Sequence, residues 1–349
     1  MDLKNIINLA NYAPSGDNCQ PWKIKLEQNR ALLFNVPETD LSLYNYKQQA
    51  SLIAHGALIE NIAIAASTKN VSCEISILPY INRPNLVAEI NFSPENVHPD
   101  PLFSSINKRV TNRKPYKAIP LSAKEKSLLM EAAGQFPNFE LKFYEGENKL
   151  PAANAFSVNE GIVLENFYLH RFLFSHVSWT KQQDNLQKVG MFIKTMEILP
   201  PKSFIFKLCS NWKIMKFLRL IKLPKLIAKE NAAIYAKSSA FGACLAQNNA
   251  QEDFIATGRL IQRVWLTATG LGLSMQPLMG IPLLHLKIQS GETVGLSPKH
   301  QTEISKTYKK IKELFDSENQ NILFSFRIGK SDPPSAVSQR LNLEQILLK

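Results

Sequence analysis

The stretch Gly56-Ala57-Leu58-Ile59-Glu60-Asn61 decides the predicted fold, because its glycine, leucine and isoleucine recur 202 positions later in the 349-residue chain. The second stretch is Gly258-Arg259-Leu260-Ile261-Gln262-Arg263. Each stretch belongs to a long apolar segment, 52–68 or 256–269, that predicts a buried helix followed by a short strand. A match at a constant offset favours an internal duplication, although two buried helices can also resemble each other by chance.

The elements around the two stretches follow the same order. Apolar residues at helical spacing predict a helix over 3–12, and alternation predicts strands over 22–26 and 31–36. The later copy has a Ser-capped helix over 122–134 and a strand over 139–144. Strands at 71–78, 273–275 and 323–328 and a helix at 308–316 complete the pattern. We therefore expect an α+β fold of two units, 1–100 and 101–349, with a helical insertion at about 150–240 in the second.

Composition and motifs exclude several classes of protein. The chain is 45% hydrophobic and 20% charged, as globular proteins are, and its 14 glycines exclude a collagen-like repeat. The six histidines and four cysteines lack metal-ligand spacing, so we expect no metal site. Hydrolase and P-loop motifs are absent, and Gly270-Leu271-Gly272 lacks the third glycine of a dinucleotide fingerprint. With no signal peptide or spanning segment in view, we expect a cytoplasmic protein.

The net charge of +12 is concentrated in one segment. Lys202 to Lys229 contains eight basic side chains and no acidic one, so the charge indicates a local patch and not a nucleic-acid groove. Large apolar residues such as Trp212 and Phe217 alternate with these cations. Two interpretations stay open for 202–229: a lid or ordinary packing, and a basic amphipathic surface that contacts an anionic membrane or a partner.

The segment 106–116 carries the clearest anion-binding pattern. Arg109, Thr111 and Arg113 lie within five residues of each other, among further basic side chains. The planar guanidinium group suits the paired oxygens of a phosphate, and a hydroxyl adds a neutral donor. Arg340 is a candidate second cation. The alternatives are a solvated basic turn for 106–116 and plain surface for Arg340.

The loop 13–22 is richer in hydrogen-bonding side chains than a simple turn requires. Ser15, Asn18 and Gln20 together are suited to the polar edge of a planar heterocycle or to a ribityl chain. The alternative is an Asx-turn that follows the first helix.

These motifs together resemble the nitroreductase-like flavoprotein family. Arg109-x-Thr111-x-Arg113 resembles its Arg-x-Ser/Thr-x-Arg motif, and 13–22 resembles its Ala-Pro-Ser-x-x-Asn-x-Gln-Pro-Trp loop. Residues 258–277 are similar to its core helix and following turn, and Ile328-Gly329 with Arg340 to its closing strand and basic tail. The motif order differs from the family's usual one, since the loop precedes the arginines. The resemblance is therefore to single-chain pseudo-dimers, such as the dormancy-associated nitroreductase-like proteins of mycobacteria.

The resemblance implies an FMN-dependent oxidoreductase that passes a hydride from NAD(P)H to a nitroaromatic, quinone or similar acceptor. Because the cofactor carries this chemistry, no catalytic side chain is expected. A flavin-binding protein with little turnover is the alternative, and the chain would be a monomeric pseudo-dimer or a homodimer. One complete and one degenerate flavin site are implied, the degenerate one near Phe136-Pro137-Asn138. The implied cofactor-binding residues are Pro14, Ser15, Asn18, Arg109, Thr111, Arg113, Pro277, Leu278, Gly280 and Arg340.

Overall fold

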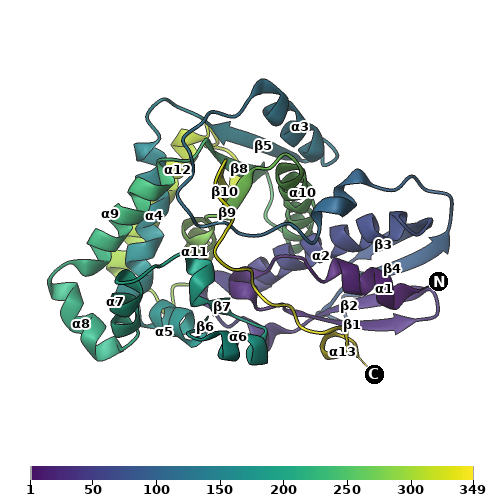
Figure 1. Cartoon of the computed structure of the whole chain (residues 1–349), viewed down its shortest axis with the longest axis horizontal. Coiled ribbons are helices and arrows are strands. Elements are labelled where there is room, and N and C mark those ends of the chain that lie inside the picture. The colour runs from purple at the N-terminus through teal and green to yellow at the C-terminus, as the bar shows by residue number, and fades with distance from the viewer. Residues whose placement is uncertain (1, 349) are drawn as a thin grey trace.

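Two four-stranded sheets form the framework of the computed structural model, which describes residues 2–348 (Figure 1). The first sheet has the order β1-β2-β4-β3 with every neighbouring pair antiparallel. Its elements, with the helices that accompany them, are α1 (Leu3–Ala10), β1 (Trp22–Glu27), β2 (Arg30–Asn35), α2 (Gln49–Ser67), β3 (Val71–Ile77) and β4 (Leu86–Pro94).

The second sheet has the order β5-β8-β10-β9, again antiparallel throughout. Matching β5, β8, β9 and β10 to β1, β2, β3 and β4 in chain order makes the two sheet orders the same. Its elements are α3 (Ala123–Ala133), β5 (Phe139–Tyr144), β8 (Ala240–Ala246), α10 (Gln251–Gly270), β9 (Ser274–Pro277) and β10 (Asn321–Gly329).

The helices α2 and α10 cross in the centre of the molecule, where each contributes one glycine. A Cβ added to Gly56 would lie 2.0 Å from the carbonyl oxygen of Ile255, and one added to Gly258 would lie 2.0 Å from that of Ile53. Both glycines are therefore required for the close approach of the two backbones. The contacts are reciprocal, because Gly258 and Ile255 lie 202 positions after Gly56 and Ile53.

Polar residues next to the crossing repeat this reciprocity. The carboxylate of Glu60 accepts a hydrogen bond from Arg263 at 2.8 Å, and the amide of Gln262 donates to Asn61 at 2.7 Å. The same offset relates Glu60 to Gln262 and Asn61 to Arg263. Since Glu60, Asn61 and Gln262 are buried, these bonds satisfy polar groups that burial would otherwise leave unpaired.

The apolar character of α2 has a structural explanation in this crossing. Within residues 2–348, only the stretch Leu43–Ser67 is long and apolar enough to cross a membrane, with a mean hydropathy of 1.3. However, 83% of its apolar window is buried inside the protein. A core helix covered on all sides has the same composition.

The insertion lies between β5 and β8; its helices α4, α7, α8 and α9 form the end of the molecule away from the first sheet, whereas α6, β6 and β7 lie nearer to it (Figure 1). Its helix α4 packs along α9, and a short parallel pair, β6 with β7, interrupts the helices. The elements are α4 (Leu150–Glu165), α5 (Phe167–Ser175), β6 (Val177–Ser178), α6 (Lys181–Gln187), β7 (Met191–Phe192), α7 (Lys202–Cys209), α8 (Trp212–Leu220) and α9 (Leu223–Tyr235). Helices α11 (Gly280–Gln289) and α12 (Pro298–Leu314) join β9 to β10.

The sequence pattern did not predict four strands, the helices α11 and α13 (Leu343–Ile346), or the start of α12. All seven residues of β8 are buried, so the strand has no polar alternation to reveal it. Strand β4 was also missed, and α12 begins at Pro298 behind a Ser297 cap, ten residues before the predicted 308–316. The predicted insertion of about 150–240 is mainly helical but also holds β6 and β7. The boundary between 1–100 and 101–349 stays a prediction.

Candidate functional site

The loop between α1 and β1 has an unusual backbone. Asp17, Asn18 and Gln20 have φ angles of 43°, 56° and 50°, in the left-handed region that non-glycine residues rarely adopt. The hydroxyl of Ser15 accepts a hydrogen bond from the amide of Gln20 at 2.9 Å and so holds the loop closed. Strained backbone of this kind is concentrated at binding sites, because the surrounding structure must maintain it.

Two predicted arginines meet at this loop. Arg109 Nη2 donates to the carbonyl oxygen of Tyr12 at 2.9 Å, and Arg340 Nη2 approaches the same oxygen at 3.4 Å. Arg340 Nη1 also donates to Asn18 Oδ1 at 2.6 Å. The structure therefore brings together Asn18, Arg109 and Arg340, which lie far apart in the sequence.

Neither arginine has a carboxylate partner. Arg109 and Arg340 form no ion pair within residues 2–348, and the Nε atom of each is buried without a hydrogen-bond partner. Burial, with the neighbouring Arg340, lowers the pKa of Arg109 to about 9, and burial lowers the pKa of Arg340 to about 10. Arg109 also stacks on Trp265, 4.6 Å from the ring centroid.

The buried Arg109 and the half-buried Arg340, which form no ion pair within the described residues, indicate a site for an anion. Removing a charge from water is costly unless an opposite charge or hydrogen bonds replace the lost solvation. A phosphate would supply both through charge-assisted hydrogen bonds to the free guanidinium nitrogens. The donor set therefore fits the phosphate of a phosphorylated ligand such as FMN.

Thr111 lies beside β9 and brings the arginine motif to this strand. Thr111 forms a parallel bridge with Met275, and the amide of Asn112 donates to the Met275 carbonyl oxygen at 3.1 Å. The predicted residues Pro277 and Leu278 follow directly along this edge of the sheet. Backbone pairing with Met275 thus places the segment 109–113 beside the strand that continues to residues 277–278.

Gly280 begins helix α11 and packs against the insertion. A Cβ added there would lie 2.0 Å from Asn159 Oδ1, which in turn accepts a hydrogen bond from the Tyr44 hydroxyl at 2.9 Å. The predicted position at Gly280 is therefore in direct contact with α4, and a larger residue there would require the Asn159 side chain to move.

Arg113 occupies a different environment from Arg109. Its Nη1 donates to the carbonyl oxygen of Thr195 at 3.1 Å. Burial lowers the pKa of Arg113, while Asp17, Tyr235 and Glu160 act to raise it. Arg113 thus faces acidic and phenolic groups, whereas Arg109 and Arg340 face each other.

Burial raises the pKa of three carboxyl groups around this part of the site. Burial raises the pKa of Asp40, and burial with the nearby Asp40 carboxylate raises that of Asp17. Burial also raises the pKa of Glu160, although the Tyr235 hydroxyl donates to it at 3.0 Å. A proton is therefore held more tightly on these carboxyl groups than in water.

Residues 188–197 of the insertion cover the loop. The carbonyl oxygen of Lys188 accepts hydrogen bonds from Asn18 Nδ2 at 3.2 Å and Gln20 Nε2 at 2.8 Å. The contact with Arg113 through Thr195 belongs to the same segment. The interpretation of 202–229 as a lid over a ring does not match this arrangement, because Phe204 and Phe217 are exposed to solvent and the covering residues precede α7.

Sequence reasoning left several contributors to the site unassigned. Tyr12 acts through its backbone carbonyl, which has no sequence signature. Trp265 and Asn159 come from helices α10 and α4, whose apolar patterns predict only core packing. Gln20 was part of the recognised loop, and the structure shows its side chain donating to the Lys188 carbonyl oxygen and accepting from the Leu341 amide, each at 2.8 Å.

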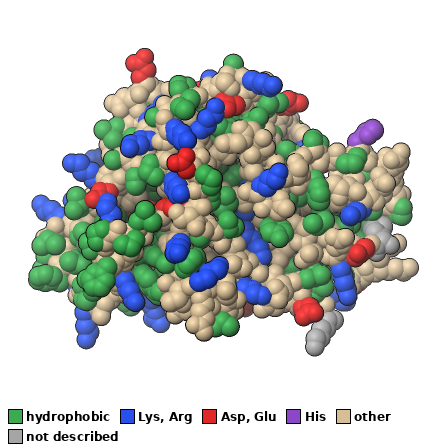
Figure 2. All heavy atoms as spheres, in the orientation of Figure 1, with side chains coloured by type: hydrophobic (Ala, Val, Ile, Leu, Met, Phe, Trp, Pro, Cys, Tyr) green, Lys and Arg blue, Asp and Glu red, His purple; other side chains and the backbone are tan. Residues whose placement is uncertain are grey.

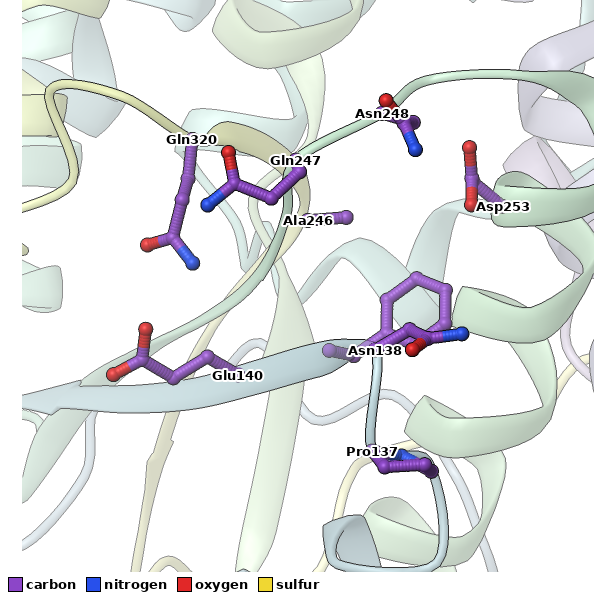
Figure 3. A pocket seen from close by; sticks show the side chains of 9 residues that line it. Pro137, Asn138, Glu140, Ala246, Gln247, Asn248, Asp253 and Gln320 are labelled. Carbon is purple, nitrogen blue, oxygen red and sulfur yellow. The ribbon is translucent and has the colours of Figure 1, made fainter.

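A separate pocket of about 420 Å³ lies at the second sheet, beside β5 and the end of β8 (Figure 3). It is lined by residues of β5, the loop after β8 and the start of α10, including the predicted degenerate loop residues Pro137 and Asn138. Figure 3 shows Glu140, Gln247 and Asp253 among its side chains. No lysine or arginine is among these described lining residues, so the donor set does not fit a phosphate. Within residues 2–348, no cluster of His, Cys, Asp and Glu forms a metal site.

Comparison with curated proteins finds distant mycobacterial relatives. The chain is 23% identical over 344 residues to "Uncharacterized protein MT1398" of Mycobacterium tuberculosis, covering 96% of this chain and 46% of that protein. It is 28% identical over 92 residues to "Putative NAD(P)H nitroreductase acg" of the same species, covering 26% of this chain and 28% of that protein. The chain thus spans less than half the length of these relatives. No protein-family model matches the chain.

Solved structures of flavin enzymes align with about 70% of the chain. One is the FMN-dependent nitroreductase NfnB from Mycobacterium smegmatis in complex with NADPH, at 13% identity and a TM-score of 0.40 over 69% of this chain and 94% of that one. Another is a nitroreductase with bound FMN from Bacteroides fragilis, at 9% identity and a TM-score of 0.36 over 70% and 95%. Scores this low carry no argument for function, which must come from the site itself.

Proposed function

We propose that this chain is an FMN-dependent NAD(P)H oxidoreductase of the nitroreductase-like family. The observation that carries the proposal is the pair Arg109, which is buried, and Arg340, which is half-buried, beside the strained loop at Ser15 and Asn18 and without an ion-pair partner among the described residues. The donor set fits a phosphate, and the surrounding motifs are those that resemble the family's flavin site. The name of the distant relative, "Putative NAD(P)H nitroreductase acg", agrees with this assignment.

In this proposal each residue has a distinct task. Arg109 and Arg340 hold the phosphate, and Thr111 supplies a neutral donor beside them. Pro14, Ser15 and Asn18 position the ribityl side, while Pro277, Leu278 and Gly280 line the ring edge. Arg113 provides a cation near the pyrimidine side, where negative charge develops on reduction. When bound, FMN supplies hydride acceptance and donation, so no catalytic side chain is needed.

We further propose that the chain is an intramolecular pseudo-dimer. Two sheets of the same strand order and reciprocal contacts at a constant offset of 202 support it, because an isologous interface pairs residue i with j and j with i. The counterpart of the site, near Pro137 and Asn138, lacks basic residues among its lining side chains. We therefore expect one FMN per chain.

A flavin-binding protein with little turnover is the second candidate. The hydrogen bonds from Asn18 and Gln20 to Lys188 favour it, because residues 188–197 cover the loop on one side. If this cover is closed in solution, nicotinamide cannot stack on the ring. The two candidates share the cofactor and differ in whether the cofactor is reduced.

The test is FMN titration followed by anaerobic addition of NADPH and NADH. We expect flavin fluorescence to report one FMN per chain and Arg340→Gln to weaken binding by roughly tenfold or more, as loss of a charge-assisted hydrogen bond does. Arg83→Gln, an exposed arginine of the first unit, is the matched control and should leave FMN affinity unchanged.

The outcomes separate the candidates. Rapid loss of the oxidised flavin band with NADPH or NADH supports the reductase, and a nitroaromatic or a quinone should then restore it. A bound flavin that neither nucleotide reduces supports the second candidate. Failure of FMN to bind, with both arginines intact, would refute both and leave 106–116 as a basic turn.

A further inference from the structure

The helices α7, α8 and α9 expose an unusual combination of side chains. Eight large apolar residues on or next to these helices are between 38% and 76% exposed. Phe217 and Leu220 are 66% and 76% exposed, although both belong to a helix of nine residues. These eight residues are Phe204, Ile205, Leu208, Ile214, Phe217, Leu220, Ile221 and Leu226, and we call them, with the cations of 202–229, the basic apolar end.

The outward apolar side chains are not needed to attach these helices to the protein. Met215, Cys209 and Leu164 form a small buried core, with Trp212 and Leu218 packed against it. Helix α8 thus has an inner apolar face that is covered and an outer apolar face that is not. Figure 1 places α8 at the extremity of the molecule, and Figure 2 shows hydrophobic and basic side chains gathered there.

Most cations of this end form no ion pair within the described residues. Lys202 pairs with Glu230 at 2.8 Å, but Lys213, Lys216, Lys222 and Lys225 form no ion pair within residues 2–348. Lys213, Lys216, Lys222 and Lys225 therefore lie among the exposed apolar residues without an ion-pair partner in the described part of the chain.

We propose that the basic apolar end docks on an anionic lipid bilayer. Charge complementarity selects this occupant: lysine ammonium groups meet lipid phosphates while aromatic and aliphatic side chains enter the acyl boundary. A second copy of the chain would place like charges face to face across a two-fold axis. This surface is separate from the candidate flavin site, so the proposal does not depend on FMN binding.

The experiment is co-sedimentation of the full chain with vesicles of phosphatidylcholine alone or with 30% phosphatidylglycerol. We expect binding to the anionic vesicles only, weakening as salt rises from about 0.1 M to 0.5 M because the charges are exposed. Phe217→Ser combined with Leu220→Ser should weaken binding at least about tenfold through lost apolar burial. The control pair Leu41→Ser and Ile81→Ser removes apolar residues of the first unit that are at least as exposed, and it should have no effect.

The contribution of the lysine charges and the insertion of Phe217 into the bilayer are tested separately. Replacing Lys213, Lys216 and Lys222 with Gln should reduce binding, whereas the same change at the exposed Lys306, Lys309 and Lys310 of α12 should not. A Phe217→Trp probe should be quenched by brominated lipid, and an Ile81→Trp probe should not. Absence of binding to anionic vesicles at low salt would overturn the proposal. So would a dimer in light scattering without lipid that Phe217→Ser with Leu220→Ser abolishes.

Discussion

At the scale of single residues, the site is built from charges that the protein does not neutralise itself. Arg340 reaches Asn18 and the Tyr12 carbonyl oxygen, but its Nε atom remains without a partner. A guanidinium group without a counter-ion lowers the stability of the folded chain, but its free donor is already positioned to bind an anion.

The first prediction concerns the effect of Arg340 on the stability of the protein with and without FMN. Arg340→Gln should raise the free energy of unfolding of the FMN-free protein by about 1 kcal/mol, because it removes a desolvated cation. The same variant should be stabilised less by added FMN than the parent chain. Urea unfolding with and without FMN measures both effects, and Arg83→Gln provides the comparison. Equal destabilisation of both forms would show that Arg340 is only structural.

The second prediction concerns pH and His55, which is fully buried on α2. Its Nε2 lies 3.1 Å from the Pro21 carbonyl oxygen, and burial lowers its pKa to about 4 from 6.5. Between these two values the unfolded chain binds a proton that the folded chain does not. The contribution of His55 to stability should therefore fall as pH decreases from 6.5 to 4, by up to roughly 3 kcal/mol.

Urea unfolding at several pH values between 7.5 and 4 tests whether the free energy of unfolding falls as pH decreases. His55→Gln retains a donor for Pro21 and should flatten part of the acid dependence, whereas His98→Gln, at an exposed position, should not. Stability that rises as pH falls through this window would contradict the assignment.

At the scale of elements, the crossing of α2 and α10 depends on the absence of two side chains. The third prediction is that Gly56→Ala lowers the free energy of unfolding by about 3 kcal/mol or more, because its Cβ would meet the Ile255 backbone. Gly161→Ala is the matched control inside helix α4, where the new Cβ would lie 3.5 Å from the nearest atom. There, higher helix propensity should leave stability unchanged or slightly higher. Thermal unfolding measures the stability of both variants. Equal effects of Gly56→Ala and Gly161→Ala would contradict the requirement for a glycine at the α2–α10 crossing.

How far these elements follow from sequence depends on their periodicity. Helices 3–12, 52–68 and 256–269 were predictable because their apolar residues recur along the chain, and each is present within a few residues of the expected bounds. Strand β8 was not predictable, because a fully buried strand has no alternation. The motifs indicated Arg109 and Arg340, but their meeting at the Tyr12 carbonyl depends on tertiary packing that no local pattern contains.

At the scale of the whole molecule, the two units hold each other together. Helix α2 buries 16 of its 19 residues, many of them against α10. The tail after β10 also returns to the first unit, where the amide of Leu348 donates to the Ile24 carbonyl oxygen at 2.8 Å.

The fourth prediction follows from this mutual burial. Residues 1–100 expressed alone should be insoluble, because α2 would expose a large apolar surface. Coexpressed with 101–349, the fragment should copurify as a folded complex. Circular dichroism and size-exclusion chromatography provide the measurements, and an independently folded, monomeric 1–100 fragment would refute the interdependence.

The position of Arg340 also imposes an order of events on synthesis. Every strand of both sheets ends by Gly329, so the ribosome has made the whole β framework before this arginine exists. Domains can begin to fold while the chain is still being made. If Arg340 helps to retain the cofactor as proposed, a nascent chain can assemble its sheets first and acquire a tightly held flavin only afterwards. A transcript truncated between these points would then encode a protein that has both sheets but holds its flavin more weakly.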